Sequence, residues 1–317
     1  MTSNHTQAYL DELKAIKDAS CYPYRSDIDP SYGYFPSFAA GVLFSILFAI
    51  PFFYHTFQSV RLRATTSILL ALGALTELIG WAARAYSGKC PYNGDAFMSQ
   101  EVTLIIAPVF FSAALYVLLG KLILDLGPRS SMISAKWYAI VFCSCDVGSL
   151  IVQAIGGARA SMADTNSDME LGTHIMVAGI AFQLLTMTLF VGFMIDFLLR
   201  VLRTQGEFRG MVTKGMKLVF VALIISTLMI YIRSVYRTIE LAQGWHGYLI
   251  SHEGYFIGLD AAIMVIAVGV FVPIDPAVVF AGEGRPGYAR KMRGVKGLSS
   301  GEPSDAELAM EPVPGRY

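Results

Sequence analysis

Residues 35–58 read FPSFAAGVLFSILFAIPFFYHTFQ, a stretch without Asp, Glu, Lys or Arg. An α-helix needs about 20 mainly apolar residues to cross the hydrocarbon core of a membrane. Six further runs of this kind follow along the chain, at about Thr65–Tyr86, Phe97–Leu124, Ala135–Gly157, His174–Leu199, Gly215–Leu241 and Gly254–Phe280. The sequence therefore predicts an all-α integral membrane protein with seven transmembrane helices.

The composition supports a membrane protein and excludes a nucleic-acid-binding protein. The chain has 317 residues, of which 55% are hydrophobic and 15% are charged, whereas soluble domains carry about 25% charged residues. Lys+Arg and Asp+Glu each number 24, so the net charge is zero. Nucleic-acid-binding domains are basic, and we therefore expect no nucleic-acid partner.

The basic residues predict the orientation, because cytoplasmic loops are enriched in Lys and Arg. They gather after the first, third and fifth runs and in the tail: Arg61, Arg63, Arg129, Lys136, Arg200, Arg203, Arg209, Lys214, Lys217, Arg285, Arg290, Lys291, Arg293 and Lys296. The opposite loops carry acids instead: Asp95, Asp164, Asp168 and Glu170. We expect an extracellular tail over residues 1–34, a seven-helix membrane domain over 35–280, and a disordered cytoplasmic tail over 281–317 that is rich in Gly, Pro, Ser and charge.

Two features are expected on the outer side. Cys21 lies in the tail and Cys90 between the second and third runs, so both face an oxidising compartment and a disulfide is predicted. Asn4 begins an Asn-His-Thr glycosylation sequon. Residues 1–34 are too polar to supply the apolar core of a cleavable signal peptide.

The charges inside the sixth run are costly unless they are buried and paired. A charged side chain at the bilayer centre costs about 2.5–3.5 kcal/mol on insertion scales. Arg233, Arg237 and Glu240 are spaced i, i+4, i+7 and share one helix face, with Tyr236 beside them. Further polar residues occur in or at the ends of other runs: Glu77, Arg84, Glu101, Asp146, Gln153, Gln183, Glu253 and Asp260.

We interpret these twelve residues as a substrate-binding set in a polar cavity that is lined by spans two to seven and open toward the outer leaflet or the outside. Buried ion pairs that only hold helices together are the alternative. The carboxylates outnumber the guanidinium groups, which suits an amine-bearing ligand or a proton relay. Arg233 or Arg237 could instead bind a phosphate or carboxylate headgroup, and the sequence does not decide between these ligands.

No metal or cofactor is expected. Cys143 and Cys145 in the fourth run have neither the spacing nor the nearby histidines of a zinc site, so we interpret them as packing residues. The chain also lacks a Gly-x-x-x-x-Gly-Lys-Ser/Thr loop and is not expected to hydrolyse ATP itself.

The chain resembles the fungal lipid-translocating exporter family, seven-span proteins linked to resistance to 7-aminocholesterol and long-chain sphingoid bases. The resemblance covers about Tyr34–Phe280. The residues that carry it are, in order, Tyr34, Pro36, Ser37, His55, Glu77, Gly80, Arg84, Gln100, Ala107, Pro108, Ala113, Ala114, Tyr116, Asp146, Ser149, Gln153, Gly156, Gly157, Gly179, Gln183, Arg233, Tyr236, Arg237, Glu240, Glu253 and Asp260. One departure is Asp275-Pro276, where such proteins often carry His-Pro.

The resemblance implies a multi-pass protein of the fungal plasma membrane that moves amphipathic lipids or small molecules, or relieves their toxicity. The leading hypothesis is therefore a lipid translocase or exporter rather than an enzyme. A seven-helix receptor or stress-signalling regulator is the alternative, although the chain lacks an Asp/Glu-Arg-Tyr triplet after the third run and an Asn-Pro-x-x-Tyr element in the last. An intramembrane lipid enzyme is the third option, and its histidines would have to come from both sides of the membrane.

Overall fold

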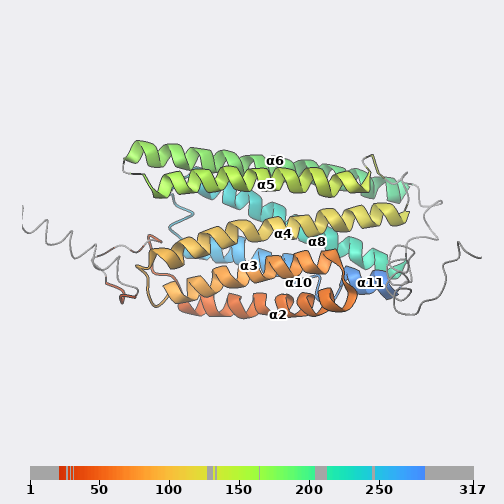
Figure 1. Ribbon diagram of the computed structural model, residues 1–317, viewed down its shortest axis with the longest axis horizontal. Helices are drawn as coiled ribbons and strands as arrows, with labels where there is room; N and C mark the ends of the chain where they lie inside the picture. Colours follow the sequence, from red (N-terminus) through yellow and green to blue (C-terminus); the bar gives the residue numbers. More distant parts are fainter. Residues whose placement is uncertain are drawn as a thin grey trace, which may run out of the picture.

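The computed structural model shows an all-helical bundle whose long helices run along a common axis (Figure 1). It describes residues 21–25, 28, 30, 32–126, 131–132, 134–163, 165–203, 213–244 and 247–282. The Asn4 sequon and the basic tail beyond Gly282 lie outside these residues.

Within these described residues, six helices are long and apolar enough to cross a membrane. They are α2 (Phe38–Leu62), α3 (Thr65–Ser87), α4 (Gly94–Leu126), α5 (Ala135–Ser161), α6 (Asn166–Arg203) and α8 (Lys214–Ala242). The last five of these contain the second to sixth apolar runs, mostly with extra residues at the ends, whereas α2 begins three residues inside the first run, after its N-cap Ser37. The chain is therefore a helical multi-pass membrane protein.

The seventh apolar run forms several shorter elements. They are α9 (Glu253–Phe256), the π-helix η2 (Ile257–Ala262), α10 (Ile263–Gly269) and α11 (Pro276–Gly282). The seventh run, over about Gly254–Phe280, is interrupted between Gly269 and Pro276, where Pro273 and Pro276 lack the N–H that a helix interior requires. Pro276 instead begins α11 as its first helical residue, and the Asp275 Oδ1 atom accepts a hydrogen bond of 2.7 Å from the Ala277 N–H.

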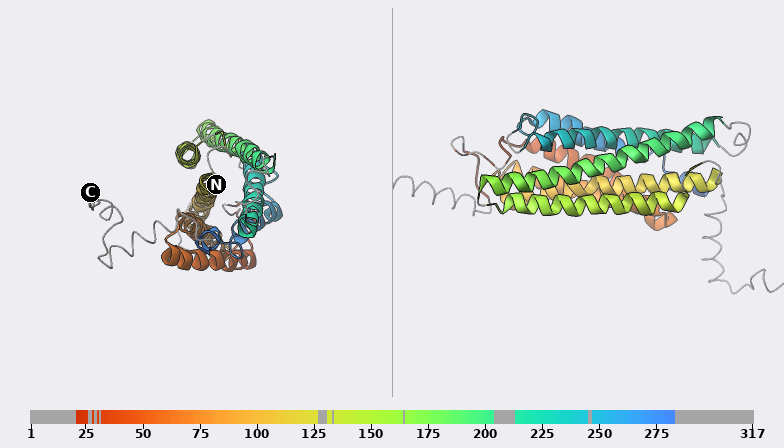
Figure 2. Two further views of the ribbon diagram at one scale, coloured as in Figure 1. Left: turned by 90° about the vertical axis from the view of Figure 1, so that its right-hand side faces the viewer. Right: turned by 90° about the horizontal axis from the view of Figure 1, so that it is seen from above.

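The helices are arranged around α4 and α8, as the end-on view in Figure 2 shows. The α5–α6 pair packs on one side of them, and α2, α3 and α10 lie on the other. α5 and α6 approach closely because Gly156 and Gly172 have no side chain: a Cβ on either would overlap the backbone of the facing helix. Small residues allow this kind of approach between membrane helices.

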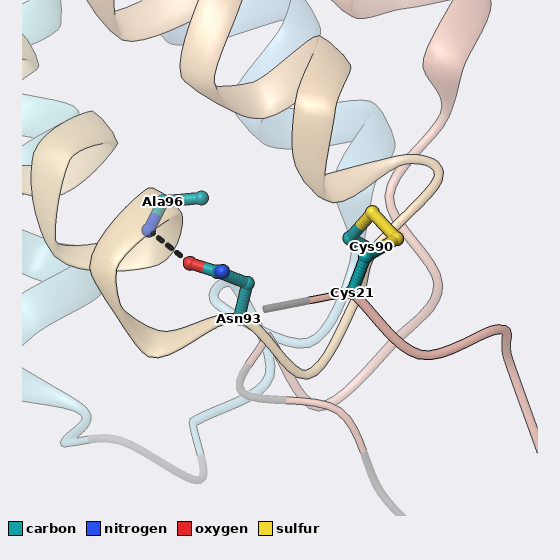
Figure 3. Close-up of a disulfide and its surroundings, with 4 residues drawn as sticks. All are labelled: Cys21, Cys90, Asn93 and Ala96. Carbon is teal, nitrogen blue, oxygen red and sulfur yellow. Dashed lines mark hydrogen bonds between the residues drawn. A yellow bond between two sulfur atoms is a disulfide. The ribbon is translucent and has the colours of Figure 1, made fainter. Parts of the chain in front are cut away.

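A disulfide links Cys21 to Cys90, the pair that the sequence predicts (Figure 3). Beside it, Asn93 caps α4 by accepting a hydrogen bond of 2.8 Å from the Ala96 N–H through its Oδ1 atom. The Tyr92 hydroxyl lies within hydrogen-bond distance of the backbone of Arg25, at 3.0 Å from the nitrogen and 2.9 Å from the oxygen. We call this end of the bundle, where α3 ends and α4 begins, the disulfide end, and the other the opposite end.

Candidate functional site

The charged stripe predicted on the sixth run lies on the buried face of α8. Arg233, Arg237 and Glu240 are 5%, 7% and 2% exposed. The Arg233 Nε atom lies 2.7 Å from Asp260 Oδ1 in an ion pair, and its Nη2 donates a hydrogen bond of 2.7 Å to the Leu104 carbonyl oxygen. Asp260 lies in the π-helical segment η2, a rare geometry that is frequent at functional sites.

Arg237 is held by two carboxylates from different helices. Its Nη1 donates to Glu240 Oε2 at 2.7 Å, and its Nη2 donates to Glu101 Oε2 of α4 at 3.2 Å. The Tyr236 hydroxyl donates a second hydrogen bond, of 2.8 Å, to Glu240 Oε1. Both oxygens of Glu240 are therefore engaged inside the bundle, whereas the Glu101 side chain is 22% exposed.

A third ion pair lies nearer the disulfide end. Arg84 Nη2 lies 2.7 Å from Glu253 Oε1 and donates to the Tyr34 hydroxyl at 2.7 Å, and its Nη1 donates to Gln100 Oε1 at 3.3 Å. The Phe256 ring faces the guanidinium at 4.7 Å, a cation–π contact. Burial raises the pKa of Tyr34 above its usual value, so this hydroxyl stays protonated. The segment preceding α2 thus contacts the buried charges directly.

Two further buried carboxylates take no part in these ion pairs. Glu77 on α3 is fully buried and neither of its oxygens has a hydrogen-bond partner. The charged groups that act on it most strongly are Arg233 and Asp260. Asp146 on α5 accepts a hydrogen bond of 2.9 Å from the Tyr116 hydroxyl through Oδ2, while its Oδ1 has no partner. Glu77 therefore adjoins the α8 charges, whereas Asp146 belongs to a separate polar contact between α4 and α5.

A small cavity of about 20 Å³, open on one side to the surroundings, lies between α4, α5, α6 and α8. Its wall consists of Ile105, Gln153, Ile180, Gln183, Arg233, Ser234 and Arg237. The Gln153 Nε2 atom donates a hydrogen bond of 2.9 Å to Gln183 Oε1 across the α5–α6 contact. The wall thus combines two guanidinium groups, two amides and a hydroxyl with two isoleucines.

The twelve candidate residues therefore fall into three groups. Four line the cavity: Gln153, Gln183, Arg233 and Arg237. Seven do not line the cavity but belong to the ion pairs described above or act on them: Glu77, Arg84, Glu101, Tyr236, Glu240, Glu253 and Asp260. Asp146 lies in its own contact with Tyr116.

This cavity differs from the sequence-based expectation in its wall. The predicted cavity wall included residues of the second and seventh spans and several acids. In the structure, α3 and the seventh region contribute none of the residues that line this cavity. The carboxylates of Asp260 and Glu240 are instead bonded to the guanidinium groups. Sequence reasoning missed Ser234, which directly follows Arg233, and the two isoleucines, which carry no signal that separates them from lipid-facing residues.

Metal chemistry finds no support among the described residues, where no group of three or more His, Cys, Asp or Glu is placed to hold a metal ion. The arrangement instead offers hydrogen-bond donors and acceptors next to buried, partly compensated charge. These donors and acceptors can form hydrogen bonds with a small polar group.

Known proteins with similar sequences come from yeast. The chain is 29% identical over 284 residues to the sphingoid long-chain base transporter RSB1 of Saccharomyces cerevisiae strain JAY291, covering 79% of this chain and 74% of that protein. It is 28% identical over 275 residues to Protein RTA1 of Saccharomyces cerevisiae, covering 78% and 85%. Protein RTM1 of the same species is 30% identical over 221 residues, covering 69% and 70%.

No solved structure shows a significant match to the chain. The family model described as RTA1 like protein matches residues 70–283. This match begins within α3, extends through α11 and includes every residue that lines the cavity. Because it spans about two thirds of the chain, and because the relatives agree with it, the chain belongs to the RTA1-like family, the fungal lipid-translocating exporters.

Proposed function

We propose that this protein moves long-chain amphiphiles of the sphingoid-base type across or out of the plasma membrane of a fungus and so relieves their toxicity. The observation that carries the proposal is the cavity between α4, α5, α6 and α8, with a polar wall inside the apolar part of the bundle. A relative that aligns over 79% of the chain is named a sphingoid long-chain base transporter, which supports the same ligand class.

The chemistry of the cavity suits a headgroup that carries both hydroxyl and amine functions. The amides of Gln153 and Gln183 donate and accept hydrogen bonds, and the remaining guanidinium N–H groups donate to hydroxyl oxygens. Glu77 has no hydrogen-bond partner and lies beside Arg233 in electrostatic terms. In this proposal an ammonium group at the cavity is balanced by the carboxylates behind the wall, among them Glu77, which does not line the cavity and acts through its charge rather than by direct contact.

The topology in this proposal has seven membrane crossings. The helical run from Glu253 to Gly269 provides the seventh, with η2 as an irregular turn inside it. Irregular backbone at membrane depth is tolerated where it is buried in protein. The N-terminus lies outside and the C-terminus in the cytoplasm. Epitope tags at the two ends, probed on intact and permeabilised cells, test this orientation.

The function is tested with purified protein in proteoliposomes that contain a fluorescent sphingoid base. We expect faster movement between leaflets than in protein-free liposomes, and loss of the excess rate in Glu77→Gln and Gln183→Leu. The matched control is Asp168→Asn, which removes a carboxylate that is about half exposed at the start of α6, and it should move lipid at the wild-type rate. Wild-type protein no faster than protein-free liposomes, with or without a proton gradient, would exclude translocation and favour the receptor hypothesis.

A further inference from the structure

A second buried pair of titratable groups lies at the opposite end of the bundle. His55 on α2 and Asp275, which caps α11, are 0% and 3% exposed, and His55 Nδ1 lies 3.7 Å from Asp275 Oδ2. Neither residue belongs to the candidate site, and the fold brings them together from the first and last described helices.

Several polar atoms in this contact are buried and unsatisfied. Both His55 ring nitrogens, Asp275 Oδ2 and the Gln58 Oε1 atom on the next turn of α2 lack a hydrogen-bond partner. The other Asp275 oxygen is engaged, because Oδ1 accepts the Ala277 N–H that begins α11. The Tyr54 ring packs edge-on against the imidazole with 5.1 Å between ring centroids. The carboxylate therefore joins α11 through one oxygen and faces α2 with the other.

The surrounding helices supply no buried charge to balance this pair. α2 packs against α3, α10 and α11, and α11 also packs against α8. α10 and α11 contain no titratable side chain, and α3 has none before Glu77. Among the described residues, the charged side chains at this end lie on or next to α2, α4, α5, α6 and α8, and none of them is buried: Arg61, Arg63, Lys121, Asp125, Lys136, Asp196, Arg200, Arg203, Lys214 and Lys217. The Lys121 Nζ atom donates to the Thr66 hydroxyl at 3.5 Å.

The charge state of the pair then depends on one proton. With that proton, the pair is neutral overall, either as imidazolium and carboxylate or as imidazole and carboxylic acid. Without it, a single negative charge is buried against an apolar surface, which is strongly unfavourable unless the group reaches water. The least costly response is separation of the segment that carries Asp275, because α11 is short and follows a non-helical turn.

We propose that His55 and Asp275 bind one shared proton, and that this proton holds α11 against α2 and closes the opposite end of the bundle. Proton loss to water leaves the carboxylate charged, and α11 with its capping residue moves away from α2. The proton enters and leaves without any redox step. This proton site lies apart from the cavity and does not depend on which ligand the cavity takes.

The separation can be measured with spin labels on full-length protein in lipid nanodiscs. Labels are placed at Val60→Cys on α2 and Val278→Cys on α11, which are 76% and 42% exposed, in a background with Cys143→Ala and Cys145→Ala. We expect a longer mean distance at about pH 9 than at about pH 5, a range that spans ordinary histidine titration.

Two variants separate the proposal from a general effect of pH. Asp275→Asn removes the carboxylate but keeps an N-cap residue, so the short distance should persist at both pH values. Asp196→Asn is the matched control: this carboxylate pairs with Arg200 on α6 and is 34% exposed, and this variant should respond to pH like the wild type. A wild-type distance that does not change with pH, or an Asp275→Asn protein that changes as much as the wild type, would overturn the proposal.

Thermal unfolding provides a second readout that needs no labels. The proposal has the folded protein bind a proton that the unfolded chain releases at high pH, so stability present at low pH is lost as pH rises. The melting temperature of the wild type should therefore fall more steeply from about pH 6 to about pH 9 than that of Asp275→Asn. Equal slopes for the two proteins would contradict a shared proton at this site.

Discussion

Arg233 of α8 and Asp260 of the π-helical segment η2 form an ion pair of 2.7 Å in which the side chains are 6% and 0% exposed. The pair fastens the irregular seventh region to the helix that carries the cavity's two guanidinium groups. The Arg233 Nη2 bond to the Leu104 carbonyl adds a link to α4. One arginine thus positions three elements around the cavity.

Breaking this pair should destabilise the protein strongly. Removing one partner of a buried ion pair costs about 3–5 kcal/mol, because the other charge stays buried without compensation. We therefore expect Asp260→Asn to lower the thermal unfolding midpoint markedly in detergent, as followed by circular dichroism. Asp196→Asn, which breaks the partly exposed pair with Arg200, should cost only about 0–1 kcal/mol.

The double variant Arg233→Met with Asp260→Leu refines this test. It removes both charges and fills similar volume, so it should be more stable than Asp260→Asn alone. If the double variant were less stable than the single one, the hydrogen bond from Arg233 to the Leu104 carbonyl would be the dominant contribution instead.

Filling the cavity should block translocation without unfolding the protein. Ser234 lines the cavity, and its hydroxyl donates to the Ile230 carbonyl of its own helix, so Ser234→Ala should keep transport. Ser234→Leu adds three carbon atoms to the wall and should abolish the excess rate in proteoliposomes. Ser144→Leu makes the same change at an exposed position on α5 and should transport normally. Equal transport by the two leucine variants would place the route elsewhere.

The close contact of α5 and α6 should depend on Gly156 but not on its neighbour. A Cβ at Gly156 would overlap the Met176 backbone nitrogen, whereas a Cβ at Gly157 would meet only the Met176 Sδ atom at 3.7 Å. Gly156→Ala should therefore lower the unfolding midpoint. Gly157→Ala should leave it unchanged or raise it, because alanine favours a helix over glycine by up to about 1 kcal/mol. The same loss in both variants would show that helix propensity or lipid contact, not interhelical distance, governs this region.

The disulfide should hold the segment before α2 over the buried charges. It spans 69 residues of sequence, and loop-closure entropy predicts a stabilisation of about 4 kcal/mol for a loop of this size. Cys21→Ser with Cys90→Ser should lower the unfolding midpoint and speed proteolysis at residues 21–37. Cys143→Ser on α5 changes a free cysteine and should do neither. Unchanged proteolysis would show that the bonds of Tyr34 and Tyr92 suffice to hold the segment.

Local sequence determined the helices and the buried stripe on α8. The lengths of the apolar runs and the i, i+4, i+7 spacing of Arg233, Arg237 and Glu240 are properties of single helices, so they can be read without knowing the packing. The same holds for the disulfide, because only Cys21 and Cys90 of the four cysteines lie outside an apolar run. The break in the seventh run was marked by two prolines, yet its exact place depends on how Asp275 caps α11.

Only the tertiary structure decided which acid of another helix pairs with each buried arginine. Six acids were candidates for three arginines. The i, i+3 spacing on α8 gives Glu240 to Arg237, whereas only the register between helices gives Asp260 to Arg233, Glu253 to Arg84 and Glu101 to Arg237. Packing also leaves Glu77 without a hydrogen bond and brings together His55 and Asp275. Hydrophobic periodicity shows which face of a helix is buried, but not which residues of other helices that face contacts. Ion pairs depend on distances of a few ångströms between elements that are far apart in the chain, and these distances are set by the packing.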